Sequence, residues 1–190
     1  MKKILLIIIL IAVGVLGWFV YSYDQSVQVH NTSDNLLFEN KTYDISFVYP
    51  SKYTLSERDG ITSDLQKYHE ITLINKNDLP LPVNGEGPTA ITIDVYSNDS
   101  SRYTAEEWAR NAKESNLKLG EGRIATTTVF GLPAVSFRWS GLYEGTTIVL
   151  AKSDKIYAFN VTYLEMGAQI IQDFVVVRDS VTFGGKSSSL

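Results

Sequence analysis

The sequence of 190 residues contains no cysteine. This absence excludes disulfide bonds, thiol catalysis, zinc–thiolate sites and a lipid anchor attached through a cysteine. Histidine is nearly as scarce, because the chain has only His30, in a polar N-terminal stretch, and His69. A zinc centre needs several protein ligands, and one histidine in a folded region does not supply a usual histidine site alone. The sequence therefore predicts no cofactor and no metal site.

Positive charge is also scarce near the N-terminus, where Lys2 and Lys3 are the only basic side chains before residue 41. Residues 24–190 carry 15 basic and 21 acidic side chains, which gives a net charge of -6. Binding to nucleic acid depends on neutralising phosphates with clustered lysine and arginine. An acidic domain without a basic cluster therefore argues against a nucleic-acid partner.

The usual motifs of catalysis are missing as well. The acids Glu57, Asp59 and Asp64 cluster around an expected turn, but they lack the spacing of a calcium-binding EF-hand. No Gly-x-Ser-x-Gly elbow occurs. Residues 184–187 end like a phosphate-binding loop, but the strand, spacing and helix of that motif are absent. The sequence thus indicates a protein that is not an enzyme.

A long apolar run is the first positive feature. Residues 4–23 contain no charge, and about 20 apolar residues in a helix span the ~30 Å hydrocarbon core of a membrane. Aromatic residues gather at its far end, and the two preceding lysines favour a cytoplasmic N-terminus. The alternative is a cleaved signal peptide, for which residues 20–22 are a weak cleavage site. We expect an uncleaved anchor that places the C-terminal domain outside the cytoplasm.

Residues 24–40 are polar apart from one apolar clump at 36–38, and they are interpreted as a short linker. Residues 185–190, at the other end, are expected to form a disordered tail. The folded domain is therefore expected over residues 41–184.

Residues 129–164 carry the densest fold signal in the chain. Runs rich in β-branched and aromatic residues alternate with glycines and with the pair Ser153-Asp154, which predicts three antiparallel strands. If that pair is a two-residue turn, Leu150 faces Tyr157 and Ile148 faces Phe159. Both faces of these strands are then apolar, because side chains alternate along a strand. A sheet that is apolar on both faces must be covered on both.

The remaining elements fit around this meander. Strands are expected at 43–50, paired with 53–57, and at 68–74, 89–96 and 123–128. Thr104 and Glu107 form a capping box that starts a helix reaching about residue 115, with Trp108 on its packing face. A second helix is expected at 168–182. The fold class is accordingly α+β, with an antiparallel sheet between helical layers and one transmembrane helix in front of it.

Three groups of residues resemble the PsbP-like superfamily, which is named after an extrinsic subunit of photosystem II and whose fold a Ran-binding nuclear-import factor shares. The resemblance covers about residues 41–184. It is carried by Tyr43-Asp44-Ile45-Ser46-Phe47-Val48-Tyr49-Pro50 with Tyr53, by Phe130-Gly131-Leu132-Pro133-Ala134 with Lys155-Ile156-Tyr157, and by Phe174 with Asp179-Ser180-Val181-Thr182-Phe183.

The resemblance implies an α/β/α sandwich and members outside the cytoplasm, or in the thylakoid lumen, that assist membrane complexes. The metal and chloride roles of photosynthetic members do not carry over, since none of their functional residues can be matched here. With its apolar N-terminal run, the chain looks more like small bacterial membrane-anchored proteins of unknown role.

Two exposed aromatics are the candidate contact residues. Trp139 and Tyr143 flank a glycine-containing turn and could contact a partner, because aromatic anchors dominate interfaces. The simpler alternative is that they cover the edge of the sheet. The leading hypothesis is a membrane-anchored binding or assembly module whose partner is a membrane protein complex. The alternatives are a small-ligand receptor with a pocket under the proline-rich loop 75–88, and an enzyme.

Overall fold

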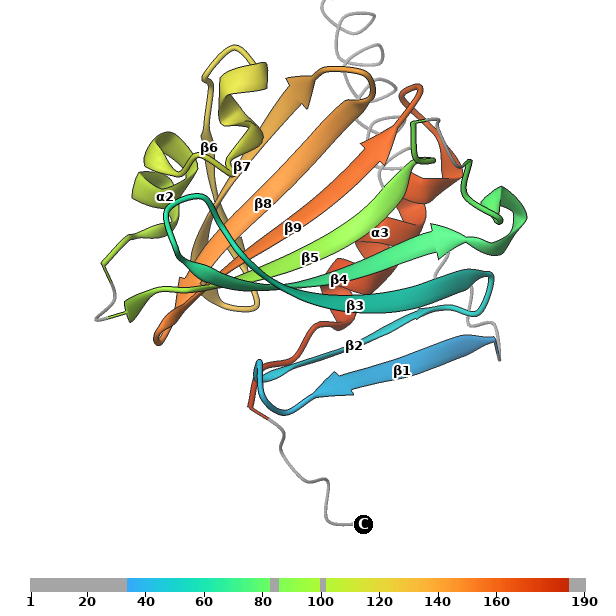
Figure 1. The fold of residues 1–190 in the computed structure, drawn as a ribbon, viewed down its shortest axis with the longest axis horizontal. Coiled ribbons are helices and arrows are strands. Elements are labelled where there is room, and N and C mark those ends of the chain that lie inside the picture. Colours follow the sequence, from blue (N-terminus) through green and yellow to red (C-terminus); the bar gives the residue numbers. More distant parts are fainter. Residues whose placement is uncertain (1–33, 83–85, 100–101, 185–190) are drawn as a thin grey trace, which may run out of the picture. The chain divides into compact units, whose positions relative to one another are not determined.

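Seven antiparallel strands form the central sheet, in the order β3-β4-β5-β9-β8-β7-β6 (Figure 1). The structure is a computed structural model that describes residues 34–82, 86–99 and 102–184. The strands of this sheet are β3 (Tyr53–Ile61), β4 (Lys67–Asn75), β5 (Ala90–Ser97), β6 (Ala125–Val129), β7 (Leu132–Ser140), β8 (Glu144–Lys152) and β9 (Lys155–Tyr163).

Smaller elements surround the sheet. A separate two-stranded hairpin precedes it, and helices and single 3₁₀ turns lie in the connections. These elements are β1 (Asn35–Asn40), β2 (Ile45–Pro50), η1 (Lys76–Asp78), α2 (Ala105–Asn111), η3 (Asn116–Leu119) and α3 (Gln169–Ser180).

The predicted register of the meander is confirmed. Leu150 lies opposite Tyr157 and Ile148 opposite Phe159, with Ser153 at a positive φ of 54° in the two-residue turn. The same register places Lys152 opposite Lys155, a like-charge pair that would be unfavourable alone. Each ammonium group has its own carboxylate, because Lys152 bonds Asp44 and Lys155 bonds Asp154, both at 2.8 Å.

Each face of the sheet is packed by a helix over its apolar part, as two apolar faces require. On one face Ile93, Phe159 and their neighbours pack against Phe174 and Val177 of α3, which runs behind the strands in Figure 1, and against the β1–β2 hairpin. Phe159 is completely buried. Burying a phenylalanine side chain contributes about 1.5–3 kcal/mol, so this layer is a main source of stability.

The opposite face packs against α2. The capping box is present: the Thr104 hydroxyl accepts from the Glu107 amide, and the Glu107 carboxylate accepts from the Thr104 amide. Trp108 and Ala109 then pack on Val149 and Ile156. The helix ends at Asn111, four residues before the predicted end, and Ser115 starts η3 by accepting a hydrogen bond from the Leu117 amide.

The predicted hairpin of residues 43–50 with 53–57 is wrong. β2 pairs with β1, whose six residues belong to the stretch interpreted as linker, while β3 pairs with β4. The physical reason lies at the turn between β1 and β2. The Asn40 side-chain oxygen accepts from the Thr42 and Tyr43 amides, and Asp44 adopts a positive φ of 54°. Phe38, part of the apolar clump, is thereby buried in the core.

The hairpin joins the rest of the domain mainly through α3. Ser46 and Thr182 exchange two backbone hydrogen bonds of 3.0 and 2.8 Å, and the Ser180 hydroxyl accepts from the Val48 amide. None of the ladders of the seven-stranded sheet includes β1 or β2. The hairpin is therefore a separate layer that packs on the α3 side.

The predicted anchor at 4–23 and the tail at 185–190 lie outside the described residues. Within 34–82, 86–99 and 102–184, no helix has the length and apolar character that a membrane span needs.

Candidate binding groove

The face that carries α3 is only partly covered. This helix contacts β2, β9 and β5, and it leaves the end of the sheet formed by β6, β7 and β8 open. A groove of about 1620 Å³ lies at this end of the sheet; it is lined by α3, by the strands, and, around the β6 edge, by the segment before β6 that includes Leu119, Gly120 and Ile124. The incomplete cover follows from the sequence, because a helix of 12 residues is about 18 Å long and cannot span a sheet of seven strands that lie ~4.8 Å apart.

The groove has an apolar base and a polar rim. Ile148, Val161 and Phe174 form the base and are buried, and Ile171 and Val175 of α3 are partly exposed beside them. This combination is typical of sites that bind a peptide or another protein surface. The polar residues around the base come from α3 and from the strands; they include Thr127, Ser136, Arg138, Glu144, Arg178 and Asp179.

Most charges of the rim are already paired. Arg178 bonds Asp179 at 2.6 Å, and the Glu144 carboxylate accepts a hydrogen bond of 2.9 Å from Ser140. Arg138 is different, because its exposed guanidinium makes no hydrogen bond or ion pair with any residue that the structure describes. A guanidinium presents several donors in a fixed plane, so Arg138 is ready to bind a carboxylate or carbonyl oxygen of a partner.

An unpaired strand edge borders the groove. β6 ends the sheet and pairs only with β7, within the described part of the chain. Its sequence, ATTTV, contains no charge and no proline, the two features that usually protect edges. The outward backbone amides and carbonyls of such an edge can pair with an added strand.

The two aromatics predicted to contact a partner lie near the groove, but their side chains do not form one contact surface. Trp139 lines the groove; its indole Nε1 donates to the Thr147 hydroxyl at 3.0 Å, and its ring lies over Gly145 on the neighbouring strand. The Tyr143 hydroxyl instead donates to the Gly87 carbonyl at 2.6 Å. Both side chains are half-buried and have partners in their own chain.

The proline-rich loop 75–88 contains η1 in its first part, and Tyr143 ties its last part to the turn between β7 and β8. None of the described residues of this loop lines the groove. The groove therefore does not extend under this loop.

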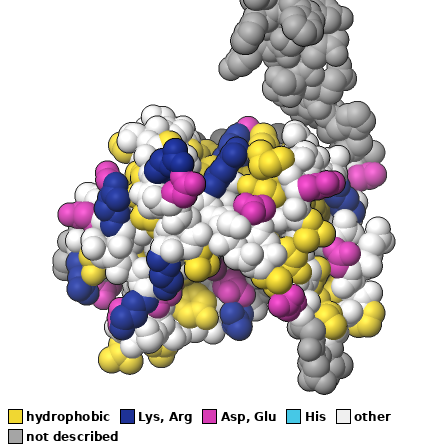
Figure 2. All heavy atoms as spheres, turned by 90° about the horizontal axis from the view of Figure 1, so that it is seen from above, with side chains coloured by type: hydrophobic (Ala, Val, Ile, Leu, Met, Phe, Trp, Pro, Cys, Tyr) yellow, Lys and Arg dark blue, Asp and Glu magenta, His cyan; other side chains and the backbone are white. Residues whose placement is uncertain are grey.

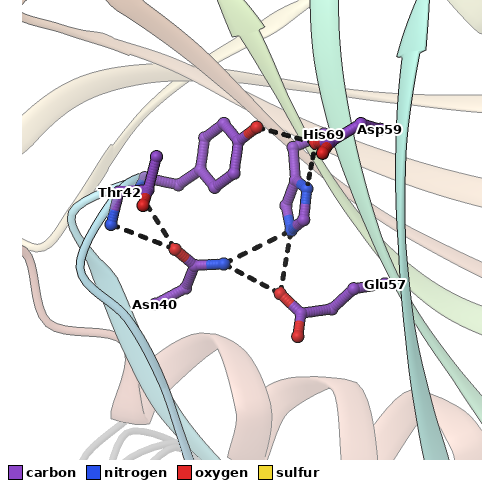
Figure 3. A network of polar contacts seen from close by, with 6 residues as sticks. Asn40, Thr42, Glu57, Asp59 and His69 are labelled. Atoms are coloured by element: carbon purple, nitrogen blue, oxygen red, sulfur yellow. Dashed lines mark hydrogen bonds and ion pairs between the residues drawn. The ribbon is translucent and has the colours of Figure 1, made fainter.

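His69 belongs to a polar network between the hairpin and the edge of the sheet (Figure 3). Its Nδ1 lies 2.7 Å from Asp59 and its Nε2 lies 3.0 Å from Glu57, while its ring stacks on Tyr43 at 4.0 Å. Asn40 completes the network by donating to Glu57 at 2.8 Å. The histidine is therefore a buried structural residue that fastens β1 and β2 to β3 and β4.

The three acids of the sequence cluster do not converge on one point. The two carboxylates lie at opposite nitrogens of the ring (Figure 3), and Asp64, the third acid of the sequence cluster, bonds Lys113. Among the described residues no three histidine or acidic side chains are placed to hold a metal ion. The Tyr43 hydroxyl donates to Asp59, which lowers the pKa of Asp59; burial and this bond raise the pKa of Tyr43 to about 12.

Asp94, which the sequence analysis does not single out, is the most perturbed carboxyl group. It lies on β5 on the α2 side, opposite Glu70 of β4. Its pKa is raised to about 7, first by burial and then by the charge of Glu70, although the Asn160 amide donates to it at 2.9 Å. Arg58, the nearby cation, bonds Glu70 instead. The only signal in the sequence is an acid in an otherwise apolar strand.

No protein-family model and no curated protein matches the chain. Solved structures do resemble it. The solution structure of cyanobacterial PsbP (CyanoP) from Synechocystis sp. PCC 6803 is 11% identical, with a TM-score of 0.55, over 84% of this chain and 98% of that protein. A crystal structure from Bacteroides thetaiotaomicron VPI-5482 is also 11% identical, with a TM-score of 0.49, over 82% of this chain and half of that one. The likeness to CyanoP confirms the PsbP-like fold that the sequence motifs imply.

Proposed function

We propose that this protein is a membrane-anchored binding or assembly module that acts outside the cytoplasm and holds an extended segment of a partner protein in the groove beside β6. One observation carries the proposal: an open groove with an apolar base lies directly beside an uncharged, unpaired strand edge. An added strand gains backbone hydrogen bonds at the edge, and its alternate side chains enter the groove. No catalytic step is part of this proposal.

The charge distribution supports a protein partner. The face in Figure 2 shows basic side chains with acidic side chains among them, and no continuous basic surface. Together with the net charge of -6 over residues 24–190, this disfavours nucleic acid. The apolar run at 4–23 supports the membrane location. The resemblance to PsbP-like proteins points to the same kind of partner.

A proline scan of β6 tests the pairing. Proline lacks an amide hydrogen and is tolerated in an edge strand only where that amide faces outward. Replacing residues 126, 127 and 128 in turn in the full-length protein should therefore give alternating results. Positions with outward amides should keep the fold and lose the partner, whereas positions with inward amides should lose stability. Capture is measured with a photo-crosslinking residue at Val175 on α3, and with the same residue at Thr54 on β3 as a control.

A specific adduct from the Val175 position that disappears with the outward-facing proline supports the proposal. Equal adducts from both positions, or adducts that survive every folded proline variant, would overturn it. The anchor is tested separately by the N-terminal sequence of the protein extracted from membranes, where a start after residue 22 would show cleavage.

A further inference from the structure

A continuous row of polar side chains crosses the other face of the sheet, beyond the end that α2 covers. Thr147 of β8 lies opposite Asn160 of β9, Asn160 opposite Thr92 of β5, and Thr92 opposite Thr72 of β4. Four neighbouring strands thus contribute one residue each at the same level. At ~4.8 Å between strands, the row is about 14 Å long.

Hydrogen bonds fix the orientation of this row. The Trp139 indole donates to the Thr147 hydroxyl at 3.0 Å, and that hydroxyl donates to the Asn160 carbonyl oxygen at 2.7 Å. The Asn160 amide then donates to Thr92 at 3.2 Å and to Oδ2 of Asp94 at 2.9 Å. Such a network holds its side chains in place before any ligand arrives.

The row keeps unused hydrogen-bonding capacity on its open side. Thr72, Thr92, Asp94 and Asn160 are all partly exposed. Oδ1 of Asp94 accepts no hydrogen bond from the described residues, and the Thr92 hydroxyl accepts from Asn160 but donates to no described residue. The face therefore offers both acceptors and donors at fixed positions.

An aromatic ring flanks the row. Trp139 lies over Gly145, so closely that a Cβ at residue 145 would come within 2.1 Å of the indole ring. The ring is held there by the bond to Thr147 and remains partly exposed. Fixed hydroxyl, amide and carboxyl groups beside an aromatic ring match a molecule whose edges carry hydroxyl groups and whose faces carry C–H groups.

We propose that the partly exposed residues of this row, Trp139, Asn160, Thr92 and Asp94, bind a short neutral saccharide, while the buried Thr147 holds Trp139 and Asn160 in place. An anionic ligand such as a phosphate is disfavoured, because Asp94 and Glu70 face the site and Arg58 is already bonded to Glu70. A metal ion would find the carboxylates of Asp94 and Glu70, and no third acidic or histidine side chain among the described residues is placed to join them. An apolar ligand would strip water from the hydroxyl and amide groups without replacing their hydrogen bonds. The site lies on the face of the sheet opposite α3, and Trp139 is the one residue of the row that also lines the groove.

The test is binding of neutral oligosaccharides to the full-length protein. The probes are tetrasaccharides of glucose, N-acetylglucosamine, mannose, galactose and xylose, each in millimolar excess, followed by isothermal titration and by NMR of the saccharide. We expect at least one probe to bind, Asn160→Ala and Trp139→Ala to weaken it at least tenfold, and Thr92→Val, which keeps the side-chain shape, to weaken it several-fold. Thr54→Ala, on β3 away from the row, is the matched control.

Thermal unfolding of each variant identifies any that fails to fold, and Thr92→Val keeps the test decisive if Asn160→Ala is lost. Failure of every probe to bind overturns the proposal. Binding that is unchanged by Thr92→Val in a folded protein, or that is weakened equally by Thr54→Ala, also overturns it.

Discussion

Replacing Asp94 by asparagine should make the stability of the protein less dependent on pH. The carboxyl group titrates near pH 7 in the folded protein, against an ordinary value of 3.8. Between these values the folded state holds a proton that the unfolded state has lost, so stability falls as pH rises. A shift of about three pH units corresponds to about 4 kcal/mol in total, of which roughly 2.5 kcal/mol falls between pH 5 and pH 8.

The assay is urea unfolding of the full-length wild-type and Asp94→Asn proteins at pH 5, 6, 7 and 8. The difference between the two free energies of unfolding is compared across the pH values. The titration of most other groups is the same in both proteins and cancels in this difference, so the remaining trend reports Asp94. The variant should gain on the wild type as the pH rises, because asparagine carries no charge into the buried site. Asp99→Asn, which removes an exposed carboxyl group, is the matched control. A difference that stays constant within about 0.5 kcal/mol, or that changes in the opposite direction, would refute the assignment of a partly buried, unneutralised carboxyl group.

Three further changes test other parts of the structure. Gly145→Val should displace the Trp139 ring and cost about 1–3 kcal/mol, seen as a red-shifted tryptophan emission and a lower urea midpoint; an unchanged emission would contradict the close packing. Thr104→Ala should cost about 1 kcal/mol by removing the α2 cap, whereas Thr104→Ser should restore most of it. The Tyr43 hydroxyl lowers the pKa of Asp59, which stabilises the folded protein at pH values above the pKa of the unfolded state. Tyr43→Phe should therefore lower the free energy of unfolding at neutral pH, and its difference from the wild type should shrink as the pH falls below about 4.

The sheet could be predicted from the sequence because its signals are local. Alternation of apolar residues and the turn at Ser153-Asp154 set the register of β8 and β9, and the capping box sets the start of α2. The pairing of β2 could not be predicted in the same way. Two strands compete for it, and the choice depends on the Asn40 turn and on contacts between residues 46 and 182, which are far apart in the chain.

The sites were harder to predict for a similar reason. The groove exists because α3 covers only part of the sheet. No single residue or motif of the sequence predicts where on the sheet this helix packs. The polar row joins Thr147, Asn160, Thr92 and Asp94, which are separated by up to 68 positions and meet only when β5 and β9 are adjacent. Trp139 was singled out for its position at a turn, but its partner Thr147 emerges only from the β7–β8 register. Local patterns thus predict helices and strands, whereas predicting the sites requires knowledge of which strands lie next to each other.

The separate β1–β2 hairpin has a mechanical consequence. Every force transmitted from the N-terminal segment must enter the domain through β1, which follows Asp34 directly in the chain. The hairpin is held to the end of α3 by the Ser46–Thr182 backbone pair, to β8 by the Lys152–Asp44 ion pair, and to β3 and β4 by the His69 network. Only the Ser46–Thr182 contact among these is a backbone pair, whereas the seven-stranded sheet is joined by continuous ladders of backbone hydrogen bonds. We therefore expect the hairpin to detach at a lower force than any strand of the sheet. A protein pulled from its N-terminal side would then extend by the residues of the hairpin, while the seven-stranded sheet and the surfaces on it stay folded.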